Sequence, residues 1–298
     1  MKSREIEVER TRLSPYTIHL VNLVAVYAIA VVGLYLVVGL GGQFSLAQGA
    51  FFGIGAYGTA LLEIRWHWHA IPAVLGGALL AAVIGMLVGI PILRLRGHYA
   101  AMATIGFGEI LYLTLLNWAT LTGGPDGLRI TRPFLASAGA LAYDRVFLVL
   151  AATLVALTAF CAVQIRRSNF GRQLMAVRDN ELAAATSGIA VTHVKVAAFA
   201  LAAFFGGLAG SLYGLLETYV SPDTFTFDFS ITLLTMLLVG GRYSVIGAVA
   251  GAVLLGFLPE WLRFLKDYYL LLFGAMVVAS VTFMPYGIVG LFKRKPRI

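Results

Sequence analysis

The sequence has few charged residues and almost no cysteine. Only 12% of its 298 residues are charged and 60% are hydrophobic, whereas a soluble chain averages about 25% charged and about 45–50% apolar residues. The single cysteine, Cys161, excludes an internal disulfide and offers no metal cluster. The mean hydropathy of +0.88 therefore predicts an all-α polytopic membrane protein in which no soluble domain is attached to the membrane domain.

Motifs for nucleotide or metal chemistry are also missing. No G-x-x-x-x-G-K-[ST] sequence occurs, so any ATP would have to be hydrolysed by another chain. Gly53, Gly55 and Gly58 form G-x-G-x-x-G, but at membrane depth this pattern favours helix–helix contact. His67 and His69 have no third ligand nearby, and their tryptophan neighbours fit an interfacial aromatic belt. We predict no bound metal or cofactor and no catalytic residue in this chain.

Long apolar runs indicate about eight full membrane spans, since a span needs about 20 mainly apolar residues. The runs lie at 17–39, 71–92, 99–117, 145–164, 194–216, 227–243, 245–262 and 268–290, and a ninth candidate lies at 40–62.

Lysine and arginine are spread unevenly over the connections. With both termini cytoplasmic and 40–62 not crossing, 16 of the 22 basic residues fall on inner segments and 6 on outer ones. The positive-inside rule favours this orientation. It predicts a cytoplasmic segment at 1–16, a membrane domain at 17–292 and a basic cytoplasmic tail at 293–298. A full crossing by 40–62 would move one terminus outside, so we expect that stretch to be re-entrant or a broken helix.

Two glycine-containing segments resemble each other. Val38–Leu46 reads "VGLGGQFSL" and Leu237–Val245 reads "LLVGGRYSV". In the predicted topology the first glycine pair lies at the outer side and the second at the inner side, as in an inverted repeat around a transport path. Chance similarity is the alternative, because small residues are common in membrane helices.

One carboxylate, Glu109, lies well inside a predicted span. A charge exposed to the bilayer centre costs about 2.5–3.5 kcal/mol, so Glu109 should face the bundle interior or a cavity. It is either a pathway or coupling-ion residue or a structural hydrogen-bond acceptor, and the sequence favours neither. The outer "TGGPDGL" segment, Thr122–Leu128, is predicted to be a turn.

The segment at 166–193 is longer than a connection needs, since about 2–8 residues suffice between helices. Ser168 or Asn169 can cap a first short helix, and Asp179 or Asn180 can cap a second, which Gly188 would stop. Amphipathic helices here suit docking into a groove of a partner protein. The alternative is a helix that lies on lipid headgroups.

Five ordered blocks of the sequence carry a family resemblance over roughly residues 20–292. They read "GLGGQFSLAQGAFFGIGAYGTALL", "LRLRGHYAAMATIGFGEI", "NWATLTGGPDGL", "RSNFGRQLMAVRDNELAAATSGI" and "VGGRYSVIGAVAGAVLLG". In order and spacing the chain resembles the M-type permease subunits of bacterial ABC importers for branched-chain amino acids. The resemblance implies no nucleic acid and, besides the lipid bilayer, three kinds of partner: a second homologous permease subunit, two cytoplasmic ATP-binding subunits that hold the ATP, and an external solute-binding protein.

The resemblance also implies roles for residues. The segment around Arg172 to Gly188 would be the coupling helix that docks in the ATPase, although "LAAATSG" matches the E-A-A-x-x-x-G pattern of other ABC permeases only loosely. The predicted coupling residues are Phe170, Gly171, Arg172, Leu174, Val177, Arg178, Glu181, Ala184 and Gly188. The predicted pathway-lining residues are Gly41, Gly42, Gln43, Ser45, Gln48, Glu109, Gly240, Gly241 and Ser244.

The sequence thus predicts a permease subunit that forms half of a translocation pore for branched-chain amino acids or related small polar solutes. Urea, short amides and other amino acids remain alternatives for the solute. A secondary transporter that uses Glu109 as its coupling-ion site is the main alternative for the function. A membrane enzyme has no supporting cluster of catalytic residues.

Overall fold

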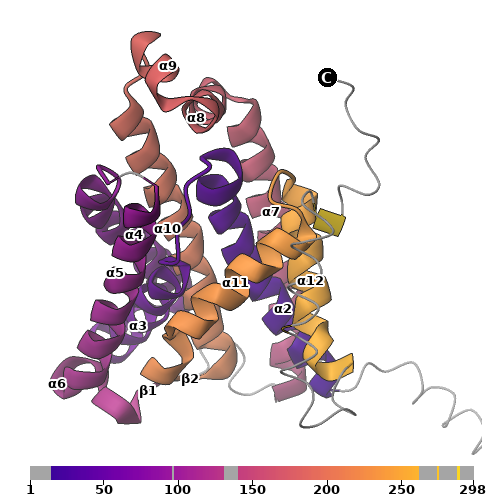
Figure 1. Cartoon of the computed structure of the whole chain (residues 1–298). Coiled ribbons are helices and arrows are strands. Elements are labelled where there is room, and N and C mark those ends of the chain that lie inside the picture. Colours follow the sequence, from indigo (N-terminus) through magenta and orange to yellow (C-terminus); the bar gives the residue numbers. More distant parts are fainter. Residues whose placement is uncertain (1–14, 96, 131–139, 262–273, 275–286, 289–298) are drawn as a thin grey trace, which may run out of the picture.

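The computed structural model describes residues 15–95, 97–130, 140–261, 274 and 287–288, which form a helical bundle (Figure 1). The elements of these residues, in chain order, are α2 (Pro15–Leu34), the π-helical turn η1 (Tyr35–Leu40), α3 (Gln48–Trp66), α4 (Ala70–Ile92), α5 (His98–Asn117), α6 (Ala119–Thr122), the 3-10 turn η2 (Gly124–Asp126), β1 (Leu128–Arg129), α7 (Ala140–Arg167), α8 (Asn169–Asp179), α9 (Glu181–Thr186), α10 (Val191–Glu217), β2 (Tyr219–Val220), the 3-10 turn η3 (Pro222–Phe225), α11 (Phe227–Gly240) and α12 (Val245–Trp261). β1 and β2 pair in antiparallel fashion.

The helices have the length and composition of membrane spans, which confirms an all-α polytopic bundle. In the described residues, five helical segments are long and apolar enough to cross: Pro15–Leu40, Ala70–Ile92, His98–Asn117, Ala142–Arg167 and Val191–Glu217. α11 and α12 pass the same test together but are bent by 120° at the break between them. The predicted number of eight is therefore approximate, and most of the predicted span 268–290 lies outside the described residues.

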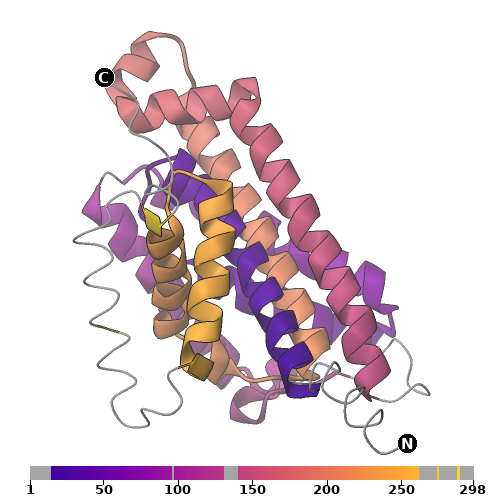
Figure 2. The ribbon, with the colours of Figure 1, turned by 90° about the vertical axis from the view of Figure 1, so that its right-hand side faces the viewer.

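The bundle has two ends, which we name after the elements that lie there. α8 and α9 form the α8–α9 end. Figure 2 shows α8 lying across the top of the bundle, directly after the end of α7. α10 starts beside α9 and ends beside β2 at the other end, the β1–β2 end. α2 runs antiparallel to α10, because His19 Nε2 lies 3.1 Å from Glu217 Oε1 near the last turn of α10.

The predicted placement of residues 1–16 and 166–193 on one side is wrong where it can be checked. Pro15 and Tyr16 begin α2 at the β1–β2 end, where the Tyr16 hydroxyl donates to Glu260 Oε2 at 2.6 Å. The 166–193 segment lies at the α8–α9 end, so a membrane crossed by the bundle would separate the two. Residues 1–14 and the predicted tail 293–298 lie outside the described residues.

The reason for this error is the 40–62 stretch. Gly42 lies under α8 against Arg178, whereas Arg65 at the end of α3 donates to the Thr120 carbonyl at the opposite end. The chain therefore passes from one end of the bundle to the other between Gly42 and Arg65. The helix is broken, as predicted, but it is not re-entrant. α11 and α12 instead form a pair that starts and ends at the β1–β2 end.

The two glycine pairs also lie differently from the prediction. A Cβ on Gly39, just before the first pair, would overlap the carbonyl oxygen of Arg242, just after the second. Both pairs therefore lie side by side at the α8–α9 end, and the helices before them, α2 and α11, both run toward that end. The placement on opposite sides was wrong, and these two segments give no support to an inverted repeat.

Close packing of α3 and α4 on α10 depends on glycine. A Cβ on Gly55 would overlap the Gly207 carbonyl, and a Cβ on Gly210 would overlap the Phe52 carbonyl. A Cβ on Gly58 would lie 3.2 Å from the Cα of Gly77 on α4. The G-x-G-x-x-G pattern thus serves helix packing, as predicted, because backbones approach closely only where side chains are absent.

The exposed face of α4 has the character of a lipid-facing surface. Its exposed large side chains are all apolar: Ile71, Leu75, Leu79, Leu80, Val83, Met86, Leu87 and Ile90. They extend over the whole length of the helix, as expected for a helix side in contact with acyl chains.

Candidate functional site

The segment between α7 and α10 folds into two short capped helices, as the sequence predicted. The Ser168 hydroxyl accepts a hydrogen bond from the Gly171 amide at 3.2 Å and caps α8. Asn180 Oδ1 accepts one from the Ala183 amide at 3.0 Å and caps α9. Gly188 adopts φ +83° and ends the segment in the left-handed region. These local signals specify their helices because each cap satisfies an amide that the first turn leaves free.

α8 buries its apolar face against the bundle. Gly171, Leu174 and Val177 are buried, at the spacing of one helix face. A Cβ on Gly171 would overlap the Ile165 carbonyl, which sets α8 directly against the end of α7. The packing identifies Gly171, Leu174 and Val177 as residues that attach α8 to the membrane helices rather than as docking residues.

α9 is more open than α8. Ala184 is buried, and Glu181 forms an ion pair with Lys195 of α10 at 2.7 Å, which fixes α9 to the start of α10. Leu182 is 69% exposed. The other predicted coupling residues of the segment differ in exposure, since Phe170 is partly buried and Arg172 is exposed.

α8 packs on the first glycine turn, which we define as residues 41–47. η1 ends there in wide turns, with the Gly41 amide bonded to the Leu36 carbonyl at 3.1 Å and the Gln43 amide bonded to the Val37 carbonyl at 3.1 Å. A Cβ on Gly41 would lie 3.3 Å from Leu174 Cδ1 of α8. Gly42 adopts φ +65°, a conformation that favours glycine.

The second glycine turn, residues 241–244, joins α11 to α12. Gly241 adopts φ +123°, and a Cβ on Gly240 would overlap the Gly247 carbonyl. The Ser244 amide bonds to the Gly241 carbonyl at 3.1 Å. Gly240 and Gly241 therefore allow the sharp bend and the close crossing of α11 and α12, which no larger residue would permit.

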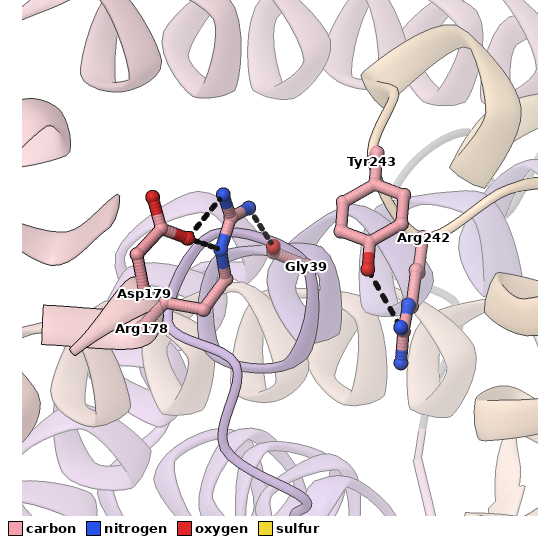
Figure 3. A network of polar contacts seen from close by, with 5 residues as sticks. All are labelled: Gly39, Arg178, Asp179, Arg242 and Tyr243. Carbon is pink, nitrogen blue, oxygen red and sulfur yellow. Dashed lines mark hydrogen bonds and ion pairs between the residues drawn. The ribbon is translucent and has the colours of Figure 1, made fainter. Parts of the chain in front are cut away.

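Arg178 lies between the two turns (Figure 3). Its Nη1 donates to the Gly39 carbonyl at 3.2 Å, and its guanidinium carbon lies 5.5 Å from the centre of the Tyr243 ring. Asp179 pairs with the same guanidinium at 2.9 Å. Arg242 Nη2 donates to the Tyr243 hydroxyl at 2.6 Å. Arg178, a predicted coupling residue, thus contacts two segments, and each of them contains one of the two glycine pairs that were predicted to line the pathway.

A cavity of about 500 Å³ lies beside this contact. It is lined by the first glycine turn, by the start of α5 and by the α8–α9 junction together with Lys195. Gln43 lines it, and both polar side-chain atoms of Gln43 are buried without a hydrogen-bond partner. Gln43 therefore contributes to the wall of this cavity, while the two polar atoms of its amide are buried and unpartnered among the described residues.

Other predicted lining residues have structural contacts. Gln48 is 2% exposed, and its Nε2 donates to the Ala30 carbonyl at 2.9 Å and to the Ala202 carbonyl at 3.3 Å. It joins α2 and α10 inside the bundle and does not reach an open face. Ser45 is buried, and its hydroxyl accepts from the Ala47 amide at 3.4 Å.

Glu109 lies on an open face of α5. Met102, Gly106, Glu109 and Leu113 are exposed at helical spacing, and a Cβ on Gly106 would have no atom within 4 Å. This face contains a carboxylate at membrane depth, in contrast to the wholly apolar large side chains of α4. A carboxylate in contact with lipid is costly, so the α5 face requires a protein partner or a water-filled space.

Three contributors to the site were not among the predicted residues. Arg242 and Tyr243 follow the second glycine pair directly, and Gly39 precedes the first. An arginine and a tyrosine beside a glycine pair are a visible signal, but Arg178, which contacts the Tyr243 ring, lies 65 residues before Tyr243, and sequence spacing does not reveal that contact.

Comparison with known proteins identifies the family of this chain. The family model described as "Branched-chain amino acid transport system / permease component" matches residues 16–281. The chain belongs to this family. It is thus an ABC transporter permease and a multi-pass membrane protein.

Two relatives show how far the similarity extends. The high-affinity branched-chain amino acid transport system permease protein LivM of Escherichia coli K12 is 36% identical, over 91% of this chain and 69% of that protein. LivH of the same organism, described as a permease protein of the same transport system, is 26% identical over 91% of this chain and 93% of that protein. The ribose import permease protein RbsC of Bacillus subtilis is 31% identical, but over only 40% of this chain and 39% of its own length. No solved structure matches the chain significantly.

Proposed function

We propose that this permease forms half of the pore of an ATP-driven importer in a bacterial inner membrane. Its solute is a branched-chain amino acid or a related small polar molecule. A second homologous permease would complete the pore, two cytoplasmic subunits would bind and hydrolyse ATP, and an external protein would deliver the solute. The names of the relatives support the solute class, since LivM and LivH are described as branched-chain amino acid permeases.

The position of α8 and α9 is the observation that carries this proposal. The pair projects from one end of the bundle and is attached through buried residues to both α7 and the first glycine turn. On its outer side, α9 exposes Leu182 together with small residues. An exposed apolar residue on a rigidly attached helix suits insertion into a groove of a partner protein.

The α5 face supports the pore. Its Glu109 requires a covering that is not lipid, and Gly106 beside it leaves open space. A second permease facing α5 across a polar path meets both requirements. We assign Glu109 and Gln43 to the lining of this path, whereas Gln48, Ser45 and Gly240 act in the support behind it.

Charge supports the orientation. The described residues of the α8–α9 end carry seven basic side chains against Asp179 and Glu181: Arg94, Arg166, Arg167, Arg172, Arg178, Lys195 and Arg242. The β1–β2 end carries Arg65, Arg129 and Arg145 against seven acidic side chains: Glu63, Asp126, Asp144, Glu217, Asp223, Asp228 and Glu260. By the positive-inside rule, the larger number of basic residues supports a cytoplasmic α8–α9 end, where an ATPase could reach it.

Transport by reconstituted complexes tests the proposal. The chain is co-expressed with a second permease and the ATPase subunits from the same genome, and leucine uptake into proteoliposomes is measured with the binding protein outside and ATP at the ATPase side. We expect ATP-dependent uptake, and Leu182→Asp should lower it at least about tenfold, since a buried interface anchor contributes about 2 kcal/mol or more. Leu182→Met, which keeps the apolar volume, is the matched control.

The competing function gives a different result. A secondary transporter would take up leucine without the ATPase and would stop when the proton gradient is collapsed, and Glu109→Gln would then abolish uptake. Leucine uptake by this chain alone under a proton gradient would overturn the proposal.

A further inference from the structure

Arg178 contacts three parts of the bundle that are far apart in the sequence. Its own helix α8 carries it, the Gly39 carbonyl accepts its hydrogen bond across a separation of 139 residues, and the Tyr243 ring faces it. Only about a quarter of the side chain is exposed, since its relative accessibility is 26%. A fully solvated surface arginine would not make these contacts. Their role therefore lies in the elements that they connect.

The contact with Gly39 acts as a helix cap. The last carbonyls of a helix lack donors within the helix, and Gly39 lies in the final turn of η1. A cation at this end also interacts favourably with the helix dipole. Arg178 therefore holds the end of the α2–η1 helix, directly before the first glycine turn.

The contact with Tyr243 crosses a gap. A cavity of about 160 Å³ separates α8 from the second glycine turn, and Arg178, Tyr243 and Arg242 line it. The Tyr243 ring has a second cation near it, since the Arg242 guanidinium carbon lies 4.8 Å from its centre. Asp179 lowers the repulsion between the two arginines by pairing with Arg178. The side chains of Arg178 and Tyr243 thus connect α8 to the second glycine turn across this cavity.

Both turns that Arg178 reaches contain a glycine with a positive φ value. Gly42 and Gly241 adopt positive φ values of +65° and +123°, and the helical segments η1 and α11 end just before them. A displacement of α8 would pull on the end of η1 and on the start of the α11–α12 bend together.

We propose that Arg178 is a positioning residue that transmits movement of the docked α8–α9 segment to both glycine turns, so that one displacement of α8 opens or closes the path. This inference rests on the proposed function, because it requires an ATPase that moves α8. It assigns Arg178 to the transmission of energy rather than to docking, which Leu182 performs.

The test compares ATP hydrolysis with leucine uptake in the reconstituted complex. Arg178→Ala should leave assembly with the ATPase and its hydrolysis rate unchanged, while the amount of leucine carried per ATP falls about tenfold or more, the size expected for losing a charge-assisted hydrogen bond together with a ring contact. The amount of leucine carried per ATP by Arg178→Lys should lie between the values for the parent and for Arg178→Ala, because a lysine cannot bond the carbonyl and stack on the ring at once. Arg94→Ala, which removes an exposed arginine from the same end of the bundle, should change neither quantity.

Tyr243 variants separate the two contacts. Tyr243→Ala should lower the ratio, Tyr243→Phe should keep most of it because the ring remains, and the double variant Arg178→Ala with Tyr243→Ala should lose little more than Arg178→Ala alone. If the loss in the double variant equals the product of the two single losses, the two residues act independently, and this result would overturn the proposal.

The outcomes also separate this inference from the function on which it rests. A parent complex without ATP-dependent uptake contradicts the proposed function, whatever Arg178 does. A working parent in which Arg178→Ala and Arg178→Lys keep the full ratio of leucine to ATP overturns the inference alone. Loss of the ATPase from Arg178→Lys complexes, measured by co-purification, would reassign Arg178 to docking and would also overturn it.

Discussion

Glycine at the points of closest approach is the residue-scale feature that shapes this bundle. On α3, Gly55 faces the backbone of α10, and the carbonyl of Gly207 occupies the space that a side chain would need. On α5, Gly106 faces open space. The same residue type thus has two different roles, and only the position of the neighbouring backbone distinguishes them.

This difference predicts opposite effects of one substitution. Gly55→Ala should destabilise the protein by about 1–3 kcal/mol, because an extra carbon must push two helix backbones apart. Gly106→Ala should leave stability unchanged or slightly higher, since alanine favours the helix by about 0.5–1 kcal/mol over glycine. The midpoints of thermal unfolding in detergent measure both, and equal midpoints for the two variants would contradict the packing described here.

The α8–α9 pair is specified at the scale of the element. Its two caps and its final glycine are local signals, and the sequence predicts them correctly. Such signals are readable because each involves residues within one helical turn of each other.

Loss of a cap should loosen one helix and leave the bundle intact. Ser168→Ala should cost about 1 kcal/mol locally, and so should Asn180→Ala. Hydrogen exchange should then be about fivefold faster at the amides of Gly171 and Ala183, respectively, by the relation between free energy and equilibrium constant. Thr153→Ala is the control, because that hydroxyl bonds to a carbonyl of its own helix α7. Unchanged exchange in both cap variants would show that tertiary packing alone holds the segment.

At the scale of the whole molecule, the sequence predicts the helical bundle and the α8–α9 segment but not the path of the chain through the membrane. α3 is the cause: its glycines and polar residues lower its hydropathy, because it packs against protein rather than lipid. The count of crossings depends on this one helix. Contacts such as that of Arg178 with Tyr243 join distant segments, so no local pattern indicates them.

Labelling of single cysteines tests the path. In a Cys161→Ala background, Pro15→Cys and Ala185→Cys should react with a membrane-impermeant thiol reagent from opposite sides, since Pro15 lies at the β1–β2 end and Ala185 on α9. Inside-out and right-side-out vesicles distinguish the sides, and a cysteine in place of Trp68 should label together with that at position 15. Labelling of positions 15 and 185 from the same side would refute the arrangement of α2 and α3.

The helices that carry α8 and α9 are longer than the membrane is thick. α7 has 28 residues and α10 has 27, which at 1.5 Å per residue gives about 40 Å each, compared with about 30 Å for the hydrocarbon core. Such helices must tilt or protrude, and a thicker bilayer takes up more of their length. The height of the α8–α9 end above the lipid therefore depends on acyl-chain length, and under the proposed function this height would set how far from the bilayer a partner ATPase docks.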